Sequence, residues 1–143
     1  MIIVHTKDTM HQIYLDALKI RQQVFVHEQN VPAALEIDAN EAYAIHFVLY
    51  DGKPKATLRL LPINSQTVKI QRMAVSREFR NQGLGQQLVL AAETFAKEQG
   101  FKEISLGAQI QAAGFYAQLA YQRLGEPFVK AGIEHVTMSK ILA

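Results

Sequence analysis

With 143 residues, of which 49% are hydrophobic and 20% charged, the chain has the composition of a single globular domain spanning residues 1–143. It has no cysteine, which excludes disulfides, thiolate metal sites and a cysteine nucleophile. The formal charge of +2 is too small to favour nucleic acid as a partner, and no apolar run reaches the ~18 residues of a membrane span. The N-terminal residues also lack the pattern of a signal peptide, so we expect a cytoplasmic protein that binds neither nucleic acid nor membrane.

The first half of the chain predicts a strand, a helix and then an antiparallel meander. Asp8 or Thr9 can cap the helix, whose apolar residues from Met10 to Phe25 recur at helical spacing. Residues 26–43 are expected to be irregular. The pair Asp51-Gly52 is typical of a hairpin turn between two strands. The expected strands are residues 2–5, 44–50, 55–61 and 67–75.

The second half predicts a strand–helix–strand unit. Beyond residue 83 the apolar residues again have helical spacing, and Gly100 fits a left-handed helix end. A short apolar strand at 103–106 should then run parallel to the strand at 67–75, through a right-handed crossover. A short helix at 112–119 and two strands, near Phe128 and at 135–141, complete the chain. We therefore expect an α/β fold: a mixed, mostly antiparallel central sheet with one parallel crossover pair, flanked by helices.

The sequence RNQGLG, at residues 80–85, lies at the junction between a strand and a helix. The first N–H groups of a helix have no partner inside it and lie at the positive end of its dipole, so they stabilise an anion. Glycines at 83 and 85 would let an anion approach the backbone, and Arg80 suits bidentate contact with phosphate. The segment has the parts of a pyrophosphate site, although a tight turn before a helix would use the same residues.

Several other sites are excluded by specific residues. The Rossmann fingerprint needs a third glycine where this chain has Leu88, and the Walker A loop needs Gly-Lys-Ser/Thr where it has Gly85-Gln86-Gln87. The five histidines are scattered without a spacing such as HExxH, so we expect no metal. No Gly-x-Ser-x-Gly elbow of a serine hydrolase occurs.

Two blocks of the sequence resemble motifs of the GNAT superfamily of N-acetyltransferases. RMAV followed by RNQGLG and a helix resembles the acetyl-CoA-binding motif: Arg80, Gly83 and Gly85 match its defined positions, and Asn81 replaces a frequent glycine. LGAQIQAAGFYAQLAYQRLG resembles the second motif, which carries a Phe-Tyr pair. Three segments, RQQVFVHEQNVP, LGAQ and KAGIEHVTM, are similar to the ElaA-like branch, from which Lys130 and Glu134 depart.

This resemblance implies an enzyme that transfers an acetyl group from acetyl-CoA to a primary amine by direct attack. It also implies that RNQGLG holds the pyrophosphate, and that the pantetheine chain pairs with the strand that carries Met73. The residues expected to bind acetyl-CoA are Met73, Ala74, Val75, Arg80, Asn81, Gln82, Gly83, Leu84 and Gly85.

Direct attack needs a deprotonated amine, a stabilised oxyanion and a proton for the departing thiolate. In the family the acid is commonly the tyrosine of the Phe-Tyr pair, here Tyr116, although a tyrosine that only packs is the alternative. His46 and His135 are candidate bases or relays, because histidine titrates near neutral pH. Structural roles for both, and a water relay with no single base, stay open.

The acceptor pocket is expected to draw on residues far apart in the sequence. The candidates are Glu28, Asp38, Arg72, Gln109 and Lys130. The acceptor would be a small-molecule or peptide amine, and since family members often pair, a homodimer is a further expectation. Two alternatives stay open. One is a non-catalytic acyl-CoA-binding or sensor domain that would not need Tyr116, and the other is a phosphate- or nucleic-acid-binding module using Arg72, Arg77 and Arg80.

Overall fold

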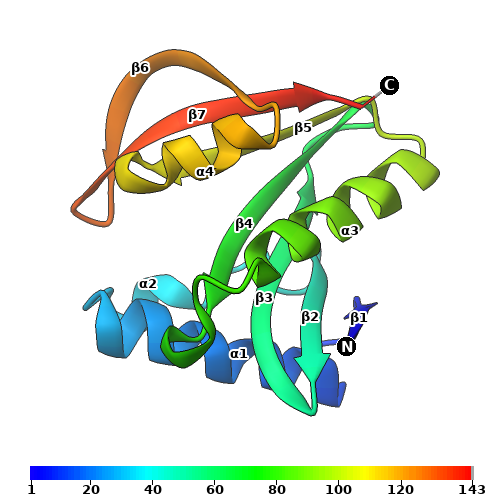
Figure 1. Cartoon of the computed structure of the whole chain (residues 1–143), viewed down its shortest axis with the longest axis vertical. Coiled ribbons are helices and arrows are strands. Elements are labelled where there is room, and N and C mark those ends of the chain that lie inside the picture. The colour runs from blue at the N-terminus through cyan, green and yellow to red at the C-terminus, as the bar shows by residue number, and fades with distance from the viewer. Residues whose placement is uncertain (143) are drawn as a thin grey trace.

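A computed structural model describes residues 1–142 and shows a seven-stranded sheet in the order β1-β2-β3-β4-β5-β7-β6 (Figure 1). Among the strands of these residues, β4 and β5 are the only parallel neighbours. The expected mixed, mostly antiparallel sheet with one parallel crossover pair is therefore confirmed. The strands are β1 (Ile2–Thr6), β2 (Ile45–Asp51), β3 (Lys53–Pro62), β4 (Thr67–Val75), β5 (Glu103–Gln109), β6 (Gln122–Lys130) and β7 (Ile133–Ile141).

Helices cover both faces of the sheet. Helix α1 (Gln12–Arg21) continues directly into a π-helix, η1 (Gln22–Glu28), and the short α2 (Ala33–Glu36) follows. Helix α3 (Leu84–Glu98) connects β4 to β5, after a 3-10 turn η2 (Arg77–Phe79). A second 3-10 turn, η3 (Ile110–Ala112), leads from β5 into α4 (Ala113–Gln118). No helix within residues 1–142 is long and apolar enough to cross a membrane.

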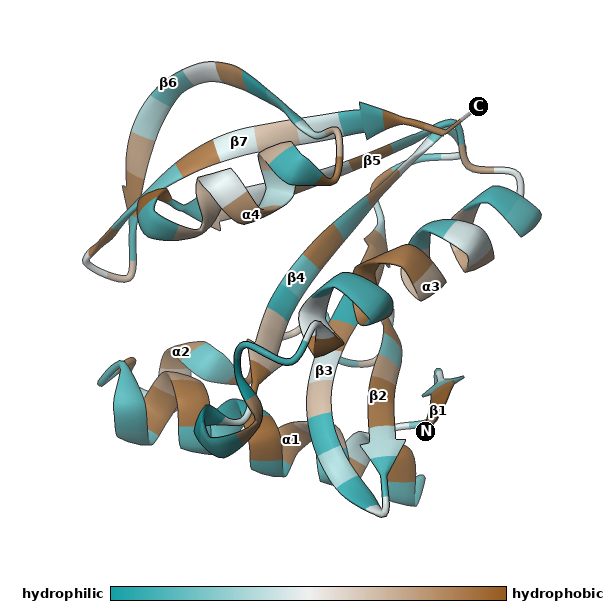
Figure 2. Ribbon diagram, viewed as in Figure 1, coloured by the Kyte–Doolittle hydropathy of each residue, from teal (hydrophilic) through white to brown (hydrophobic). Residues whose placement is uncertain are grey.

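Two hydrophobic clusters follow from the alternation of side chains along the strands. Phe47 and Leu49 of β2 belong to the larger cluster, which also contains Leu88 of α3. Val48, between them in sequence, belongs to the smaller cluster with Ala17 and neighbouring residues of α1. Successive residues of a strand point to opposite faces, so α3 and α1 lie on opposite sides of the sheet. Figure 2 shows the same alternation of hydrophobic and hydrophilic residues along β4.

The sheet opens between β4 and β5. The two strands pair over four residue pairs only, from Thr67 with Glu103 to Ile70 with Leu106, and both continue beyond this point. In Figure 1, β4 runs diagonally away from β5 toward α1 and α2. Beyond this point, Gln71–Val75 of β4 and Gly107–Gln109 of β5 do not pair with each other, so the facing edges of the two strands are free.

A bulge in β4 accompanies this opening. Thr57 of β3 pairs with Ala74, and Arg59 pairs with Gln71, so two steps along β3 correspond to three steps along β4. The extra residue lies at Arg72–Met73, where Arg72 has a positive φ of 54°. A bulge bends a strand and increases its local twist, which is consistent with the turn of β4 away from β5.

Three expectations at the level of elements are wrong. His11, rather than Asp8 or Thr9, caps α1, because its Nδ1 accepts from the Ile13 N–H while Asp8 binds the Met10 N–H in a preceding turn. Met10 is consequently exposed outside the helix. Residues 26–43, expected to be irregular, include the end of η1 and all of α2. Strand β5 extends to Gln109, three residues beyond the expected end.

Candidate functional site

A cleft with a volume of about 1110 Å³ lies where β4 and β5 diverge. Its lining comes from η1 and α2, from β4 and the start of α3, and from β5, α4 and the β6–β7 hairpin. This volume slightly exceeds the ~300–1,000 Å³ that is usual for small-molecule sites, so it has room for an extended ligand. The exposed edge of β4 can pair with such a ligand as an additional strand would.

The N-terminus of α3 faces this cleft. Gly83, the residue before the helix, has φ of 77°, and Asn81 has φ of 64°. Both line the cleft, and a Cβ added at Gly83 would meet no atom within 4 Å. The open space over Gly83 and the N–H groups of the first helical turn are the features that an anion site at a helix N-terminus requires.

Gly85 lies close to side chains of other elements. It lies within α3 and has an ordinary helical backbone, but a Cβ there would lie 2.9 Å from Cε of Met73 and 3.4 Å from Cζ of Phe115. The absence of a side chain at Gly85 therefore makes room for the Met73 side chain of β4. Gly85 also lines the cleft, and its contact with an anion stays a prediction.

The Arg80 side chain has its donors engaged by protein atoms. Its Nε donates to the Val75 carbonyl at 3.0 Å, and its two terminal nitrogens donate to the Glu28 carboxylate at 2.5 and 2.7 Å. This bidentate bond lowers the pKa of Glu28 and raises that of Arg80. Glu28, expected at the acceptor pocket, does not line the cleft; it contacts Arg80 of the segment RNQGLG instead. Gln82 also lies outside the lining, unlike the other residues expected to bind acetyl-CoA.

Tyr116 lines the cleft from α4 and is buried. Its hydroxyl donates to the Sδ of Met73 at 3.2 Å. Burial raises the pKa of Tyr116 above its ordinary value, so the phenol keeps its proton at neutral pH. A thioether is a weak acceptor, so this proton remains available to a stronger one.

Beside α2, on the side of the cleft away from α4, three arginines and three carboxylates form one network. They are Arg21, Arg59, Arg72, Glu36, Asp38 and Glu41. Arg21 binds Glu36 at 2.6 Å and Glu41 at 2.8 Å, and Arg59 binds Glu41 at 2.6 Å. Asp38, which lines the cleft, accepts from Arg59 at 2.8 and 3.0 Å. Burial acts to raise the pKa of Asp38, but the hydrogen bonds and charge of Arg59 hold it well below the usual range.

Arg72, at the bulge of β4, fastens the α2 segment to the sheet. It donates to the carbonyl oxygens of Leu35 and Glu36, each at 3.2 Å, and to Asp38 at 3.3 Å. Arg72, predicted as a residue of the acceptor pocket, lines the cleft. Its hydrogen bonds hold the α2 segment against β4.

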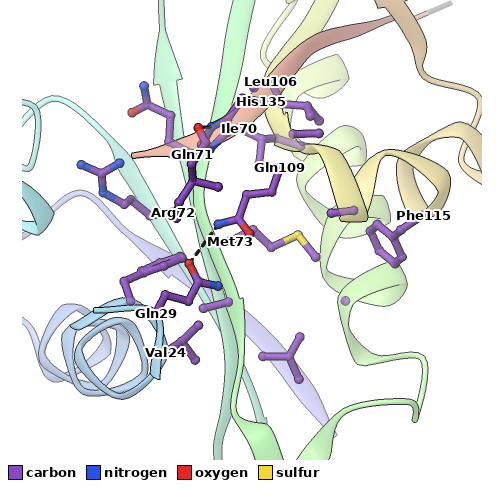
Figure 3. Close-up of a pocket in the computed structure, with 18 of the residues that line it drawn as sticks. Val24, Gln29, Ile70, Gln71, Arg72, Met73, Leu106, Gln109, Phe115 and His135 are labelled. Atoms are coloured by element: carbon purple, nitrogen blue, oxygen red, sulfur yellow. Dashed lines mark hydrogen bonds between the residues drawn. The ribbon is translucent and has the colours of Figure 1, made fainter. Parts of the chain in front are cut away.

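Two further expected residues meet at the centre of the cleft. Gln109 of β5 donates to Gln29, the residue after η1, at 2.9 Å, which joins the two walls (Figure 3). His135 of β7 lines the cleft, and its Nδ1 lies 2.7 Å from the Ile133 carbonyl. Because that carbonyl can only accept, Nδ1 carries the hydrogen, and Nε2 of the neutral ring is left able to accept a proton. The ring of His135 stacks on Phe128 at 5.6 Å.

His46 is not part of the cleft. It is 1% exposed, its Nε2 lies 2.8 Å from the Glu41 carbonyl, and its ring contacts Tyr14 edge-on. Burial lowers its pKa. The expectation of His46 as a base or relay is therefore corrected, and its role is to fix the loop before β2.

Some lining residues have no motif that singles them out. Gln29, Lys69 and Phe128 line the cleft, and none was selected from the sequence as a site residue. Gln29 lies inside RQQVFVHEQNVP, a segment chosen only for its resemblance. Lys69 alternates with the buried Val68 and Ile70 along β4, so strand periodicity alone could have placed it on the same face as Gln71.

Residues 6–142 match the family model described as "Acetyltransferase (GNAT) domain". YjcF, an uncharacterized N-acetyltransferase of Bacillus subtilis, is 38% identical over 126 residues, which cover 87% of this chain and 90% of that protein. The crystal structure of a Lactobacillus plantarum protein superposes with a TM-score of 0.92 at 29% identity, covering 99% of this chain and 98% of that one. ElaA of Escherichia coli superposes with a TM-score of 0.85 at 27% identity, covering 98% and 99%.

A more distant structure contains a ligand. A GNAT family acetyltransferase from Elizabethkingia anophelis, solved with acetyl-CoA bound, superposes with a TM-score of 0.70 at 18% identity and covers 99% of this chain and 97% of that one. At this identity the likeness shows a shared fold. The resemblance to ElaA and to the wider family, expected from the motifs, is confirmed by these comparisons.

Proposed function

The chain belongs to the GNAT family of acetyltransferases, and we propose that its cleft transfers the acetyl group of acetyl-CoA to a primary amine. The observation that carries the proposal is the divergence of β4 from β5 beside the N-terminus of α3. One cleft thus offers an unpaired strand edge and a helix N-terminus side by side.

The proposed cofactor site uses both features. The N–H groups at the start of α3, over the open space at Gly83, suit the pyrophosphate. The edge of β4 from Gln71 to Val75 suits the amide groups of the pantetheine chain. Arg80 would add charge to the phosphate site when its nitrogens exchange Glu28 for phosphate oxygens.

In the proposed reaction the amine nitrogen attacks the thioester carbonyl carbon, and the carbon–sulfur bond breaks. A backbone N–H on the free edge of β4 near Met73 is suited to stabilise the negative charge on the carbonyl oxygen. Tyr116 would give its phenolic proton to the departing thiolate, since its present acceptor is the weak thioether of Met73.

The acceptor amine must lose a proton, because alkylamines near pKa ~10.4 are mostly charged at neutral pH. His135 is the proposed base or relay, since its Nε2 carries the free lone pair and the residue lines the cleft. Gln109, which joins the two walls, is proposed to orient the amine. Binding by acetyl-CoA without turnover of any amine would favour the alternative of an acyl-CoA sensor.

A calorimetric titration with acetyl-CoA, followed by an amine screen, tests the proposal. We expect micromolar binding of acetyl-CoA, much weaker binding of AMP, and release of CoA on addition of suitable amines. Absence of binding to folded, ligand-free protein would refute the proposed cofactor site. Binding without release of CoA, across amines that include 4-aminobutyrate, butylamine and putrescine, would refute the proposed reaction while retaining the site.

A further inference from the structure

We call the part of the cleft lined by Glu36, Asp38 and Arg72 its acceptor end. The carboxylates there are already paired with arginines. Asp38 is bound by Arg59 and Arg72, and Glu36 lies 2.6 Å from Arg21 and 3.7 Å from Arg72. One oxygen of Glu36, Oε2, has no hydrogen-bond partner, but it is shielded from solvent in a side chain that is 2% exposed. An incoming ammonium group therefore finds no carboxylate that is both accessible and free of an arginine.

Two lysines at the same end have no such partner. Lys69 of β4 and Lys130 of the β6–β7 hairpin both line the cleft, and within residues 1–142 neither forms an ion pair or a hydrogen bond to a carboxylate. Glu134, beside the hairpin, does not line the cleft. The three arginines of the network balance its three carboxylates (Glu36, Asp38 and Glu41), so Lys69 and Lys130 add two positive charges that no carboxylate there neutralises.

The lysines and Arg72 act on one another. Partial burial lowers the pKa of Lys130, and the charges of Arg72, Lys69 and Arg59 lower it further, with Asp38 opposing them. These cations are therefore close enough to repel one another. An anion bound between them would relieve that repulsion, whereas a second cation would increase it.

We propose that the acceptor carries an anionic group, a carboxylate or a phosphate, which Lys130 and Lys69 bind while its amine reaches the edge of β4. The inference rests on the proposed acetyl transfer and deepens it. The substrate class is then amino acids, acidic peptide termini or phosphorylated amines, and polycations such as polyamines and aminoglycosides are disfavoured. Phe128, stacked on His135 beside Lys130, adds a flat apolar surface for the body of such a substrate.

Two matched series of amines test this inference through kcat/KM. The first is 4-aminobutyrate, butylamine and putrescine, and the second is 4-(aminomethyl)benzoate, benzylamine and p-xylylenediamine. Within each series the size and the attacking amine are similar and the distal charge changes. Phosphoethanolamine and ethanolamine separate phosphate from carboxylate. In at least one of the two series, we expect kcat/KM for the anionic amine to exceed kcat/KM for the diamine at least fivefold.

The charge reversal Lys130→Glu tests whether Lys130 causes that preference. We expect it to lower the ratio of anionic to cationic turnover at least tenfold and to leave the affinity for acetyl-CoA unchanged. Lys7→Glu, the same charge change at an exposed residue outside the cleft lining, should leave the ratio unchanged. A preference for the diamines in both series, or a ratio that Lys130→Glu does not alter, would overturn the inference.

Failure of the proposed reaction has a separate outcome. If acetyl-CoA binds but no amine is acetylated, binding of 4-aminobutyrate and 4-(aminomethyl)benzoate to the CoA-loaded protein is measured by NMR titration. Saturable binding that Lys130→Glu abolishes supports the anionic subsite. Absence of saturable binding overturns it.

Discussion

The hydroxyl group of Tyr116 donates its hydrogen bond to the sulfur of Met73, 3.2 Å away, from α4 to the bulged part of β4. The same Met73 side chain occupies the space that Gly85 leaves open in α3. Met73 therefore contacts both Tyr116 of α4 and the first turn of α3. It thereby brings β4, α3 and α4 together at one point of the cleft. Nothing in the local sequence distinguishes Met73 from any other methionine in a strand.

Replacement of Tyr116 by Phe should lower kcat by about 10²-fold, because the departing thiolate loses its proton donor. The KM for acetyl-CoA should change little, since the aromatic ring remains. Steady-state kinetics across pH 6–9 check this. An unchanged kcat throughout that range would remove Tyr116 as the acid.

The variant Met73→Leu is the control for that experiment. It keeps an apolar side chain of similar size and removes only the sulfur that accepts from Tyr116. A change in kcat within about threefold is expected if Tyr116 acts as a proton donor to the thiolate. A loss as large as that of Tyr116→Phe would mean that the contact between the two residues, rather than the phenolic proton, sustains turnover.

Glu28→Gln should tighten the binding of acetyl-CoA. The carboxylate and the phosphate would use the same two nitrogens of Arg80, and an exposed ion pair is worth about 0.2–1 kcal/mol, so a gain of about 1.4- to fivefold is expected. Arg80→Ala should weaken binding by roughly 1–3 kcal/mol. Calorimetry on both variants and on the double variant checks this, because Glu28→Gln should have no effect once Arg80 is absent. Weaker binding by Glu28→Gln would instead assign Glu28 to the positioning of Arg80.

Gly83→Val should abolish or severely weaken the binding of acetyl-CoA, since its side chain would enter the open space over the start of α3. The positive φ of 77° adds a strain of roughly 1–2 kcal/mol for any residue with a Cβ. Gly52→Val is a matched control, with φ of 79° and also no atom within 4 Å, in the turn between β2 and β3. Urea unfolding should show similar losses for both variants, and calorimetry should show lost binding for Gly83→Val alone. Equal affinities would contradict the phosphate site.

Asp38→Asn should destabilise the fold at pH 7 by about 1.5–3 kcal/mol, the range for hydrogen bonds to a charged group. The pKa of Asp38 is depressed in the folded protein, so its stabilisation is complete above the ordinary carboxyl range near 4 and is lost as pH falls toward the folded-state value. Urea unfolding at pH 7, 5 and 3 should therefore show a difference from the wild type that shrinks only in acid. The exposed Asp51→Asn should cost less than about 1 kcal/mol. A difference for Asp38→Asn that does not depend on pH would contradict the role of its charge.

The sheet and the turn at residues 80–85 before α3 could be predicted because local signals specify them. Short apolar segments bounded by turn residues place β2, β3 and β4, and the change to helical spacing after Gly83 places α3. The glycine at 83 is needed for a local reason, its positive φ, and this is visible in the sequence as part of a motif. The antiparallel meander and the parallel crossover follow from connection lengths.

The acceptor end could not be predicted in the same way, because it depends on contacts between distant residues. Arg59 and Asp38 are separated by 21 positions and Arg80 and Glu28 by 52, and no local pattern links either pair. His46 and His135 look equivalent as strand histidines, yet one is enclosed behind Tyr14 and the other lines the cleft. The π-helix that continues α1 also could not be predicted, because its sequence has the same periodicity as a regular helix.

The bulge at Arg72–Met73 ties the cleft to the length of one strand. Removal of a single residue there would leave Gln71 opposite Arg59 and Ala74 opposite Thr57 at regular spacing, so the bulge would be lost while the later side chains kept their faces. The bend that accompanies the separation of β4 from β5 would be lost with it. Single substitutions along β4 can alter affinity or rate, but a deletion of one codon would straighten the strand and change the shape of the cleft wall. For lineages that diverge from this chain, the spacing between Gln71 and Ala74 is a stronger constraint than the identity of either residue between them.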